Sequence, residues 1–238
     1  MTRPDDPPDL SGFGAFSLLH PLDGGHRNAV WCAARGDARF VAKSSRRSAA
    51  ALAWLVPVQQ LARDAGFVVP KMLQAADGSY LSTGWTLEGF VTGQAAQPGD
   101  LDRLAGRIAD MHRRGVGIGQ RPGFCSAREL LGQTRGGDVD LSALPPALAT
   151  RCRAAWADLT GVETCIHADL AVGNVIITPK GPALIDWDEA RRDLPVFDLS
   201  PQDAASHNAR MAWEIACSWL MEPDRASALA LTWATSSP

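Results

Sequence analysis

The residues whose types could carry out chemistry gather in one segment, residues 165–190, which reads CIHADLAVGNVIITPKGPALIDWDEA. It holds the carboxylates of Asp169 and Asp186 and the carboxamide of Asn174. Such oxygen donors suit a hard cation such as Mg²⁺, whose other ligands are substrate phosphates and water. Zinc is disfavoured because only His167 offers a nitrogen nearby. The competing interpretation is that these polar residues only cap the ends of a hairpin.

Two short apolar runs flank a Pro-Lys-Gly-Pro sequence in this segment, and this pattern predicts a β-hairpin with a four-residue turn. If Thr178 pairs with Ala183 across the turn, the side chains of Asn174 and Asp186 leave the hairpin at its open end. Asp169 lies just before the hairpin in the sequence. The sequence therefore predicts that a cation site forms at the hairpin mouth.

The motif H-x-D-x-x-x-x-N at 167–174, followed by I-D-W-D at 185–188, resembles the paired signature of the aminoglycoside phosphotransferase and choline kinase superfamily. It is also similar to the protein-kinase motifs H-R-D-x-x-x-x-N and D-F-G, but Ala168 replaces the Arg and Trp187 replaces the Phe. These differences favour the branch that acts on small molecules.

Only eleven residues separate Asp186 from Asp198, and the chain has no A-P-E triplet, so the activation segment of protein kinases has no room. Asp198 matches a later Asp of the family that supports the catalytic loop from behind.

The resemblance implies a role for each motif residue. Asp169 would accept the proton of a substrate hydroxyl, and His167 would order the catalytic loop. Asn174 and Asp186, with Asp188, would hold Mg²⁺ on the β- and γ-phosphates of ATP, with GTP also possible. The implied activity is transfer of the γ-phosphate to a hydroxyl of a small molecule, as in enzymes of aminoglycoside resistance.

Phosphoryl transfer also needs cations and backbone amides over the phosphates. Gly24 and Gly25 supply a flexible loop, and Lys43 ends a predicted strand in the position of the family's phosphate-binding lysine. Residues 86–93 resemble the family's linker between lobes, where the backbone would meet the adenine at the three residues Glu88, Phe90 and Val91. The helix after Lys43 contains no Glu to pair with it, and its polar candidates are Ser48, Gln59, Gln60 and Asp64.

The expected fold class is α+β, a bilobal protein-kinase-like fold with an antiparallel-sheet N-lobe and a mostly helical C-lobe. Predicted strands lie at 28–34, 39–43, 71–74 and 80–87, and a helix at 48–64 that Pro57 kinks or divides. Predicted helices follow at 101–111, 127–131, 212–219 and 223–233. The expected domains are a disordered lead-in over 1–10, a nucleotide-binding N-lobe over 11–93 and a C-lobe over 94–238 with the catalytic loop and acceptor pocket.

The composition limits the classes of partner. A formal net charge of −3 gives no footprint for nucleic acid or an anionic membrane. The five widely spaced cysteines indicate reduced, partly buried thiols, and no signal peptide or membrane span is expected, so a cytoplasmic location is predicted. Oligomeric state is left open.

The acidic region after the metal motif would favour an amine-bearing acceptor, or it is simply a solvated acidic face. Two other functions are possible. One is a catalytically weak kinase-like module that binds nucleotide as a regulatory signal, which the missing Glu permits. The other is a metal-dependent hydrolase, which would need further His or carboxylate ligands at close spacing, and none is found.

Overall fold

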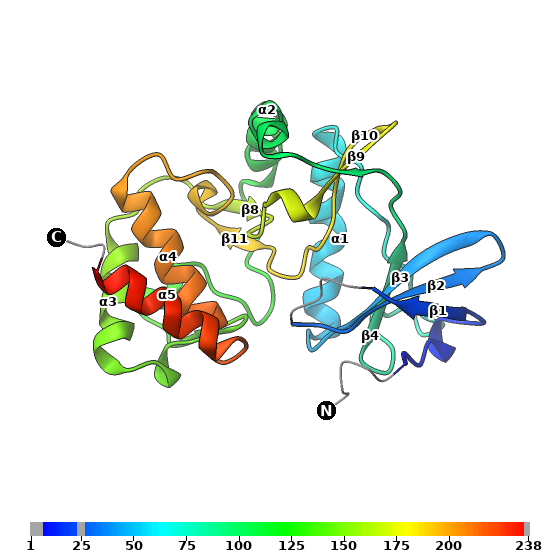
Figure 1. Cartoon of the computed structure of the whole chain (residues 1–238), viewed down its shortest axis with the longest axis horizontal. Helices are drawn as coiled ribbons and strands as arrows, with labels where there is room; N and C mark the ends of the chain where they lie inside the picture. The colour runs from blue at the N-terminus through cyan, green and yellow to red at the C-terminus, as the bar shows by residue number, and fades with distance from the viewer. Residues whose placement is uncertain (1–6, 23–26, 236–238) are drawn as a thin grey trace. The chain divides into compact units, whose positions relative to one another are not determined.

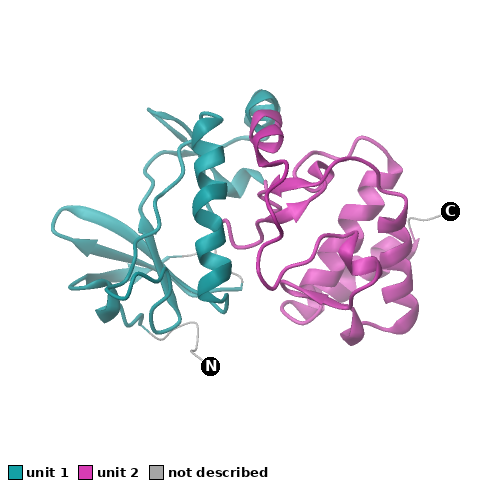
Figure 2. Cartoon of the chain, turned by 180° about the vertical axis from the view of Figure 1, so that it is seen from behind, with its two compact units in different colours: residues 1–108, 171–185 teal, residues 109–170, 186–238 magenta. Residues whose placement is uncertain are grey.

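The computed structural model describes residues 7–22 and 27–235 (Figure 1). These residues form two compact units that interleave in sequence (Figure 2). Unit 1 comprises residues 1–108 and 171–185, and unit 2 comprises residues 109–170 and 186–238. The expected lobe boundary at residue 93 stays a prediction, because these units are defined by backbone contacts and not by ligand binding.

Unit 1 contains an antiparallel sheet in the order β1-β2-β3-β4. Its strands are β1 (Ser17–Pro21), β2 (Val30–Arg35), β3 (Ala38–Ser44) and β4 (Trp85–Gly89). Gly36, with a φ of +60°, permits the two-residue turn that joins β2 to β3. Alternate residues such as Ala42 and Leu87 point into a core and are fully buried, as the period of two predicts. The strand predicted at 71–74 is wrong, because this segment makes only an isolated bridge between Met72 and Glu88.

Helix α1 (Ala49–Asp64) confirms the helix predicted at 48–64. Ser48 caps its N-terminus by accepting a hydrogen bond from the amide of Ala51 at 3.2 Å. The helix runs through Pro57 without a break, so the predicted division into two helices is wrong. Pro57 and Ala53 both lie on the exposed side, where water can satisfy the carbonyl that proline leaves without a partner.

The disordered lead-in predicted over residues 1–10 needs correction for residues 7–10, while residues 1–6 lie outside the described part of the chain. Leu10 is 5% exposed and packs in the core of unit 1 beside Phe13 and Trp85. The carbonyl of Leu10 accepts from the amide of Phe13, and that of Asp9 accepts from the hydroxyl of Thr83 at 2.6 Å. Burial of one leucine outweighs the proline-rich composition here.

A second sheet of unit 1, in the order β10-β9-β5, holds the hairpin. Its strands are β5 (Gln94–Ala95), β9 (Val175–Thr178) and β10 (Gly181–Leu184). The predicted register is wrong by two residues, since Thr178 pairs with Gly181 and Val175 with Leu184. The Thr178 hydroxyl donates to the carbonyl of Gly181 at 2.8 Å and so closes a two-residue turn.

Helix α2 (Pro98–Gly115) continues from unit 1 into unit 2, since the division falls after Ile108. It contains the predicted helix at 101–111, and Leu104, Ile108 and Met111 lie buried on one face as the spacing predicts.

The remaining helices of unit 2 pack side by side, α3 against α4 and α4 against α5 (Figure 1). Their bounds are α3 (Pro146–Ala157), α4 (Ala204–Ser218) and α5 (Pro223–Thr235). Trp156 and Trp213 fill the core between them, with ring centroids 5.8 Å apart, so these tryptophans serve packing. Helix α3 escaped the sequence analysis because its apolar residues are mostly alanines.

Short elements complete unit 2. The strands are β6 (Arg135–Gly136), β7 (Val139–Asp140), β8 (Thr164–Ile166) and β11 (Arg191–Asp193), and β8 pairs with β11 in antiparallel orientation. The short 3₁₀ turns of the chain are η1 (Ser11–Phe13), η2 (Glu129–Leu131), η3 (Leu141–Ala143), η4 (Val172–Asn174) and η5 (Pro195–Phe197). The helix predicted at 127–131 is thus reduced to η2. Across the part of the chain that is described, no helix has the length and hydropathy to cross a membrane.

Candidate active site

The catalytic loop follows β8 directly, and a buried carboxylate holds its backbone. Asp198 accepts hydrogen bonds from the amides of His167 at 2.9 Å and Ala168 at 2.6 Å. Ala168 has a φ of +69°, a conformation that costs an alanine about 1–2 kcal/mol. The two bonds offset this strain and turn the chain so that Asp169, the next residue, lies exposed at the surface of unit 2.

Asp198 is 4% exposed, and it also accepts from Nε2 of His112 at 2.8 Å. Burial by itself would raise the pKa of this carboxyl group. The hydrogen bond from His112, its charge and that of His167 outweigh burial and hold the pKa of Asp198 below its ordinary value. Asp198 is therefore an anion. It supports the catalytic loop, as expected from the sequence, by accepting hydrogen bonds from two backbone amides.

The imidazole of His167 is fully buried and packs against the indole of Trp187, with ring centroids 4.6 Å apart. Trp187 is 3% exposed. The two motifs of the sequence, one ending in Asp169 and the other beginning at Asp186, are thus tied together through a ring contact inside unit 2. The imidazole of His167 thus packs inside unit 2 and not at its surface.

Asn174 lies at the open end of the hairpin, where its carbonyl accepts from the amide of Ile185 at 3.1 Å. Asp186 follows Ile185 in the chain and has a φ of +59°, a left-handed conformation that Asp adopts more readily than most residues. The hairpin register predicted from sequence would have paired Asp186 within the sheet. The observed register leaves Asp186 beyond the last pair of residues in the hairpin. Asn174 belongs to unit 1 and Asp186 to unit 2, and each offers a side-chain oxygen of the kind that Mg²⁺ prefers.

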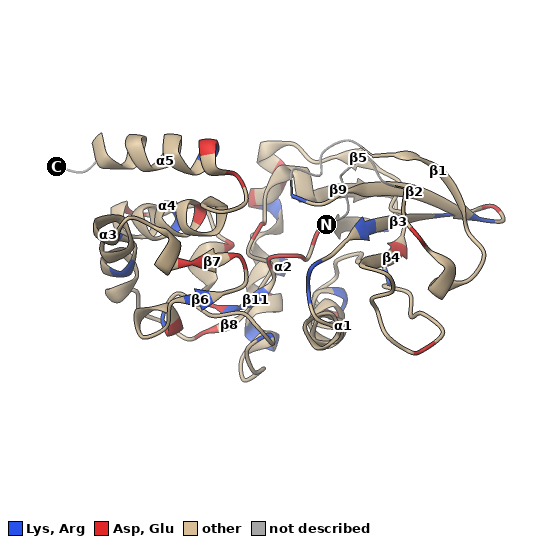
Figure 3. Cartoon of the chain, turned by 90° about the horizontal axis from the view of Figure 1, so that it is seen from below, with Lys and Arg blue, Asp and Glu red and all other residues tan. Residues whose placement is uncertain are grey.

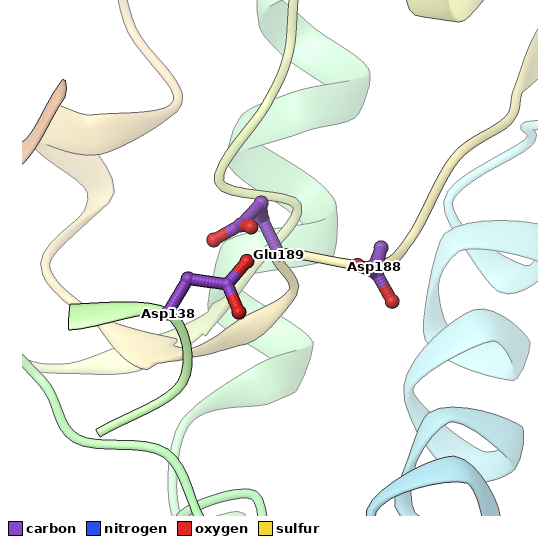
Figure 4. A group of neighbouring side chains, drawn as sticks. All are labelled: Asp138, Asp188 and Glu189. Carbon is purple, nitrogen blue, oxygen red and sulfur yellow. The ribbon is translucent and has the colours of Figure 1, made fainter. Parts of the chain in front are cut away.

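Asp188 lies in a different acidic group (Figure 4). One carboxylate oxygen each of Asp138, Asp188 and Glu189 lie within 4.8 Å of one another. Asp138 comes from the turn between β6 and β7, and all three residues are partly buried. The sequence analysis missed Asp138, because strands of two residues leave no hydrophobic period to detect.

The nucleotide end predicted from sequence falls in unit 1. Lys43 lies on β3, opposite Val30 on one side and Thr86 on the other. Gly24 and Gly25 lie outside the described residues. In the expected linker, Glu88 pairs with Val41 in the sheet.

Two backbone amides of this linker already have partners inside unit 1. The amide of Gly89 donates to the carbonyl of Lys71 at 3.2 Å, and that of Phe90 donates to the carbonyl of Arg39 at 3.1 Å.

Of the four polar candidates on α1 for a partner to Lys43, the structure leaves one on the buried side of the helix. Ser48 is the N-cap, and Gln60 donates to Asp64 at 2.8 Å on the exposed side. Gln59 is 2% exposed and shares its face with the core residues of α1. A neutral carboxamide thus occupies the buried face on which the family resemblance implies a carboxylate.

An antiparallel sheet with a helix after its third strand, followed by a helical part that carries the H-x-D loop, defines the kinase-like class of phosphotransferases. The chain belongs to the phosphotransferase enzyme family, whose model matches residues 19–219. It is thus an enzyme of the small-molecule kinase class, and the sequence resemblance is confirmed. The comparison with curated proteins found no match.

Three solved structures show the same fold. An aminoglycoside phosphotransferase, APH(4)-Ia, in a ternary complex with AMP-PNP and hygromycin B is 15% identical, with a TM-score of 0.65 over 95% of each chain. Spectinomycin phosphotransferase APH(9)-Ia, in complex with ADP and spectinomycin, is 11% identical, with a TM-score of 0.55 over 90% of this chain and 83% of that one. Amicoumacin kinase hAmiN, with AMP-PNP and Ca²⁺, is 14% identical, with a TM-score of 0.57 over 86% and 73%.

Proposed function

We propose that this enzyme transfers the γ-phosphate of ATP to a hydroxyl group of a small molecule, with Asp169 as the general base. The observation that carries the proposal is the loop held by Asp198, which binds the backbone amides of His167 and of the strained Ala168, directly before the exposed Asp169. A positioned base of this kind contributes about 10²–10⁴ in rate.

In the proposed reaction, a carboxylate oxygen of Asp169 accepts the proton of the acceptor hydroxyl while the hydroxyl oxygen forms a bond to the γ-phosphorus. The bond from the γ-phosphorus to the bridging oxygen breaks, and ADP leaves with the electron pair. Lys43 binds phosphate oxygens, and Asn174 and Asp186 would hold Mg²⁺. When bound, Mg²⁺ neutralises charge on the β- and γ-phosphates. Complexes of related enzymes with ADP or AMP-PNP support the choice of ATP over GTP.

In this proposal residues 11–93 form the nucleotide-binding lobe, with Glu88, Phe90 and Val91 beside the adenine, and residues 94–238 bind the acceptor. The enzyme acts in the cytoplasm, where ATP and Mg²⁺ are available. The prediction that it binds no nucleic acid rests on its net charge, and Figure 3 shows basic and acidic positions interspersed along both units.

The acceptor is an amine-bearing compound, because Asp138, Asp188 and Glu189 gather three carboxylates beside the second motif. Such a group attracts an ammonium. Hygromycin B and spectinomycin are bound by related enzymes, and a role in resistance to an antibiotic of that kind follows from this proposal.

A second candidate is a weak or inactive kinase-like module that binds nucleotide as a signal, and the observation that favours it is the neutral Gln59 on the buried face of α1. A carboxamide carries no charge, so Gln59 cannot form with Lys43 the ion pair that the family resemblance implies for this helix. The two candidates differ in one measurable property, the transfer of phosphate.

The test compares the wild type with Asp169→Asn in Mg²⁺-dependent binding of ATP and GTP and in phosphate transfer to a panel of aminoglycosides and amino alcohols. Asp158→Asn is the matched control, since Asp158 is an exposed carboxylate of the same unit at the end of α3. We expect all three proteins to bind Mg²⁺-ATP and only Asp169→Asn to lose transfer. Binding without transfer by the wild type would favour the signalling module, and absence of nucleotide binding would refute both.

A further inference from the structure

Arg121 is a fully buried arginine whose side chain donates hydrogen bonds to backbone carbonyls of the segment that follows Asp186. Its Nη1 donates to the carbonyl of Asp188 at 2.7 Å and to that of Ala190 at 2.9 Å, with a longer contact to that of Trp187 at 3.4 Å. These residues form no helix and no long strand, so their carbonyls have few partners in regular secondary structure. The buried guanidinium of Arg121 supplies the hydrogen-bond donors that a helix or sheet would otherwise provide for these carbonyls.

The guanidinium is held from the other side by Phe124, whose ring centroid lies 4.2 Å from Cζ. Gln120, the residue before Arg121, also binds this segment through its side chain. Its amide donates to the carbonyl of Arg192 at 2.8 Å, and its carbonyl oxygen accepts from the amide of Arg192 at 3.0 Å. Two consecutive side chains thus hold the backbone from Trp187 to Arg192 at both ends.

The held segment is the one that the proposed chemistry depends on. It begins one residue after Asp186, whose φ of +59° must be maintained against relaxation to the ordinary region. It also carries the side chains of Asp188 and Glu189, and its Trp187 packs on the ring of His167. A shift of this backbone would move the carboxylate of Asp186 and loosen the ring contact at the same time.

We propose that Arg121 is a positioning residue that holds the segment after Asp186 in the conformation that binds the metal, and so sets the affinity for Mg²⁺. This inference rests on the proposed function. Arg121 takes no part in the proton transfer or the phosphoryl transfer. The groups that orient metal ligands usually contribute about 10–100-fold to metal affinity.

The test uses three variants. Arg121→Met removes the cation and keeps an apolar stem, whereas Arg121→Lys keeps a cation with three donors for the three carbonyls. Arg153→Met is the matched control, since Arg153 also donates to two loop carbonyls of the same unit, those of Leu130 at 3.1 Å and Gln133 at 3.0 Å. The measurements are Mn²⁺ binding in the presence of ADP, ADP binding without metal, and amide hydrogen exchange over residues 186–192.

We expect Arg121→Met to weaken Mn²⁺ binding by about tenfold or more, with metal-free ADP binding unchanged and exchange over 186–192 accelerated. Arg121→Lys should recover most of the metal affinity, and Arg153→Met should match the wild type. Equal metal affinity in Arg121→Met and the wild type, both folded, would overturn the proposal, as would equal losses in Arg121→Met and Arg153→Met.

Failure of the proposed function would look different. If the wild type binds neither ADP nor Mn²⁺, the kinase reaction is wrong whatever Arg121 does, and the inference on Mg²⁺ affinity fails with it. Exchange over 186–192 then still reports whether Arg121 holds the segment. If Arg121→Met does not fold, Arg121→Lys carries the test, because a folded Arg121→Lys with metal affinity as low as that of Asp186→Asn would contradict the role of the cation.

Discussion

Replacing Asp198 with asparagine separates the positioning of the catalytic loop from the stability of unit 2. One oxygen of Asp198 accepts from His112 and from the amide of His167, and the other accepts from the amide of Ala168. Asparagine keeps only one acceptor oxygen, so its amide group must face one of these donors. A hydrogen bond to a charged acceptor contributes about 1.5–3 kcal/mol, and we expect Asp198→Asn to lower the free energy of unfolding by at least that amount.

The loss of activity should be larger than the loss of stability implies. Without the bond to its amide, the strained Ala168 can relax and carry Asp169 away from its position. A small displacement of a reacting group costs on the order of 10²-fold, so we expect kcat for phosphate transfer to fall by about that factor at a temperature where the variant is folded. Steady-state kinetics and urea unfolding on the same samples give both quantities.

The matched control is Asp193→Asn. Asp193 is also buried and accepts three hydrogen bonds, from Arg191 at 2.9 Å, Ala127 at 3.1 Å and Leu194 at 2.8 Å. Breaking a buried ion pair costs about 3–5 kcal/mol, so this variant should lose at least as much stability as Asp198→Asn. Its kcat should stay near that of the wild type, because Asp193 does not hold residues 167–168. Equal kcat losses in the two variants would refute the reasoning.

The pH dependence of stability gives a second measurement on Asp198. Its pKa is lower in the folded state than in the unfolded state, so its contribution to stability is present above the ordinary Asp pKa and is lost as the pH falls through the folded value. The difference in unfolding free energy between the wild type and Asp198→Asn should therefore shrink below about pH 4. A difference that stays constant down to pH 2 would mean that the carboxylate charge contributes nothing.

Two further predictions concern packing and thiol chemistry. Gly93→Ala should lower the melting temperature, because a Cβ there would clash with the carbonyl oxygen of Ile177. Gly106→Ala, whose Cβ meets nothing within 4 Å, should be stabilising by about 0.5–1 kcal/mol. Thermal unfolding checks both variants, and equal shifts would contradict the clash. Burial raises the pKa of the Cys152 and Cys165 thiols to about 12, so the native protein should not react with a disulfide reagent at pH 8 at these positions, and mass spectrometry showing labelling before unfolding would disprove it.

The sequence already limits where the motif residues can lie, because they are close together along the chain. His167 and Asp169 lie two residues apart on one loop, and Asp186 follows a hairpin strand, so their order along the chain already limits where they can lie. The hairpin register could not be read in the same way. It depends on the hydroxyl of Thr178, which bonds the carbonyl of Gly181 and favours a shorter turn than the Pro-Lys-Gly-Pro sequence suggests.

Residues from distant parts of the chain were harder to predict. Asp138 joins Asp188 and Glu189 only because a hairpin of two-residue strands folds back onto the segment after Asp186. The burial of Arg121 could not be predicted from the sequence, because an arginine followed by proline and glycine is typical of an exposed turn. Its burial depends on tertiary contacts with Phe124 and with loop carbonyls, which no local pattern encodes.

The two strained residues of the site have the same kind of support. Ala168 and Asp186 both adopt a left-handed backbone without being glycine, and each lies at or beside a residue assigned to the chemistry. Asp198, a buried anion, gathers amides next to the first, and Arg121, a buried cation, gathers carbonyls next to the second. Loops cannot satisfy their backbone groups with regular ladders as helices and sheets do, so side chains supply the partners.

A buried ion solves this problem for several backbone groups at once, and it also makes the conformation sensitive to one side chain. An amide such as Asn or Gln could satisfy fewer of these groups, and a water molecule would leave the loop freer to move. We therefore expect substitutions of Asp198 and Arg121 to affect different properties: loss of Asp198 should mainly lower kcat through Asp169, and loss of Arg121 should mainly lower metal affinity through Asp186. A double variant should show nearly additive effects if the two anchors act independently, and strong non-additivity would show that the contact between His167 and Trp187 couples them.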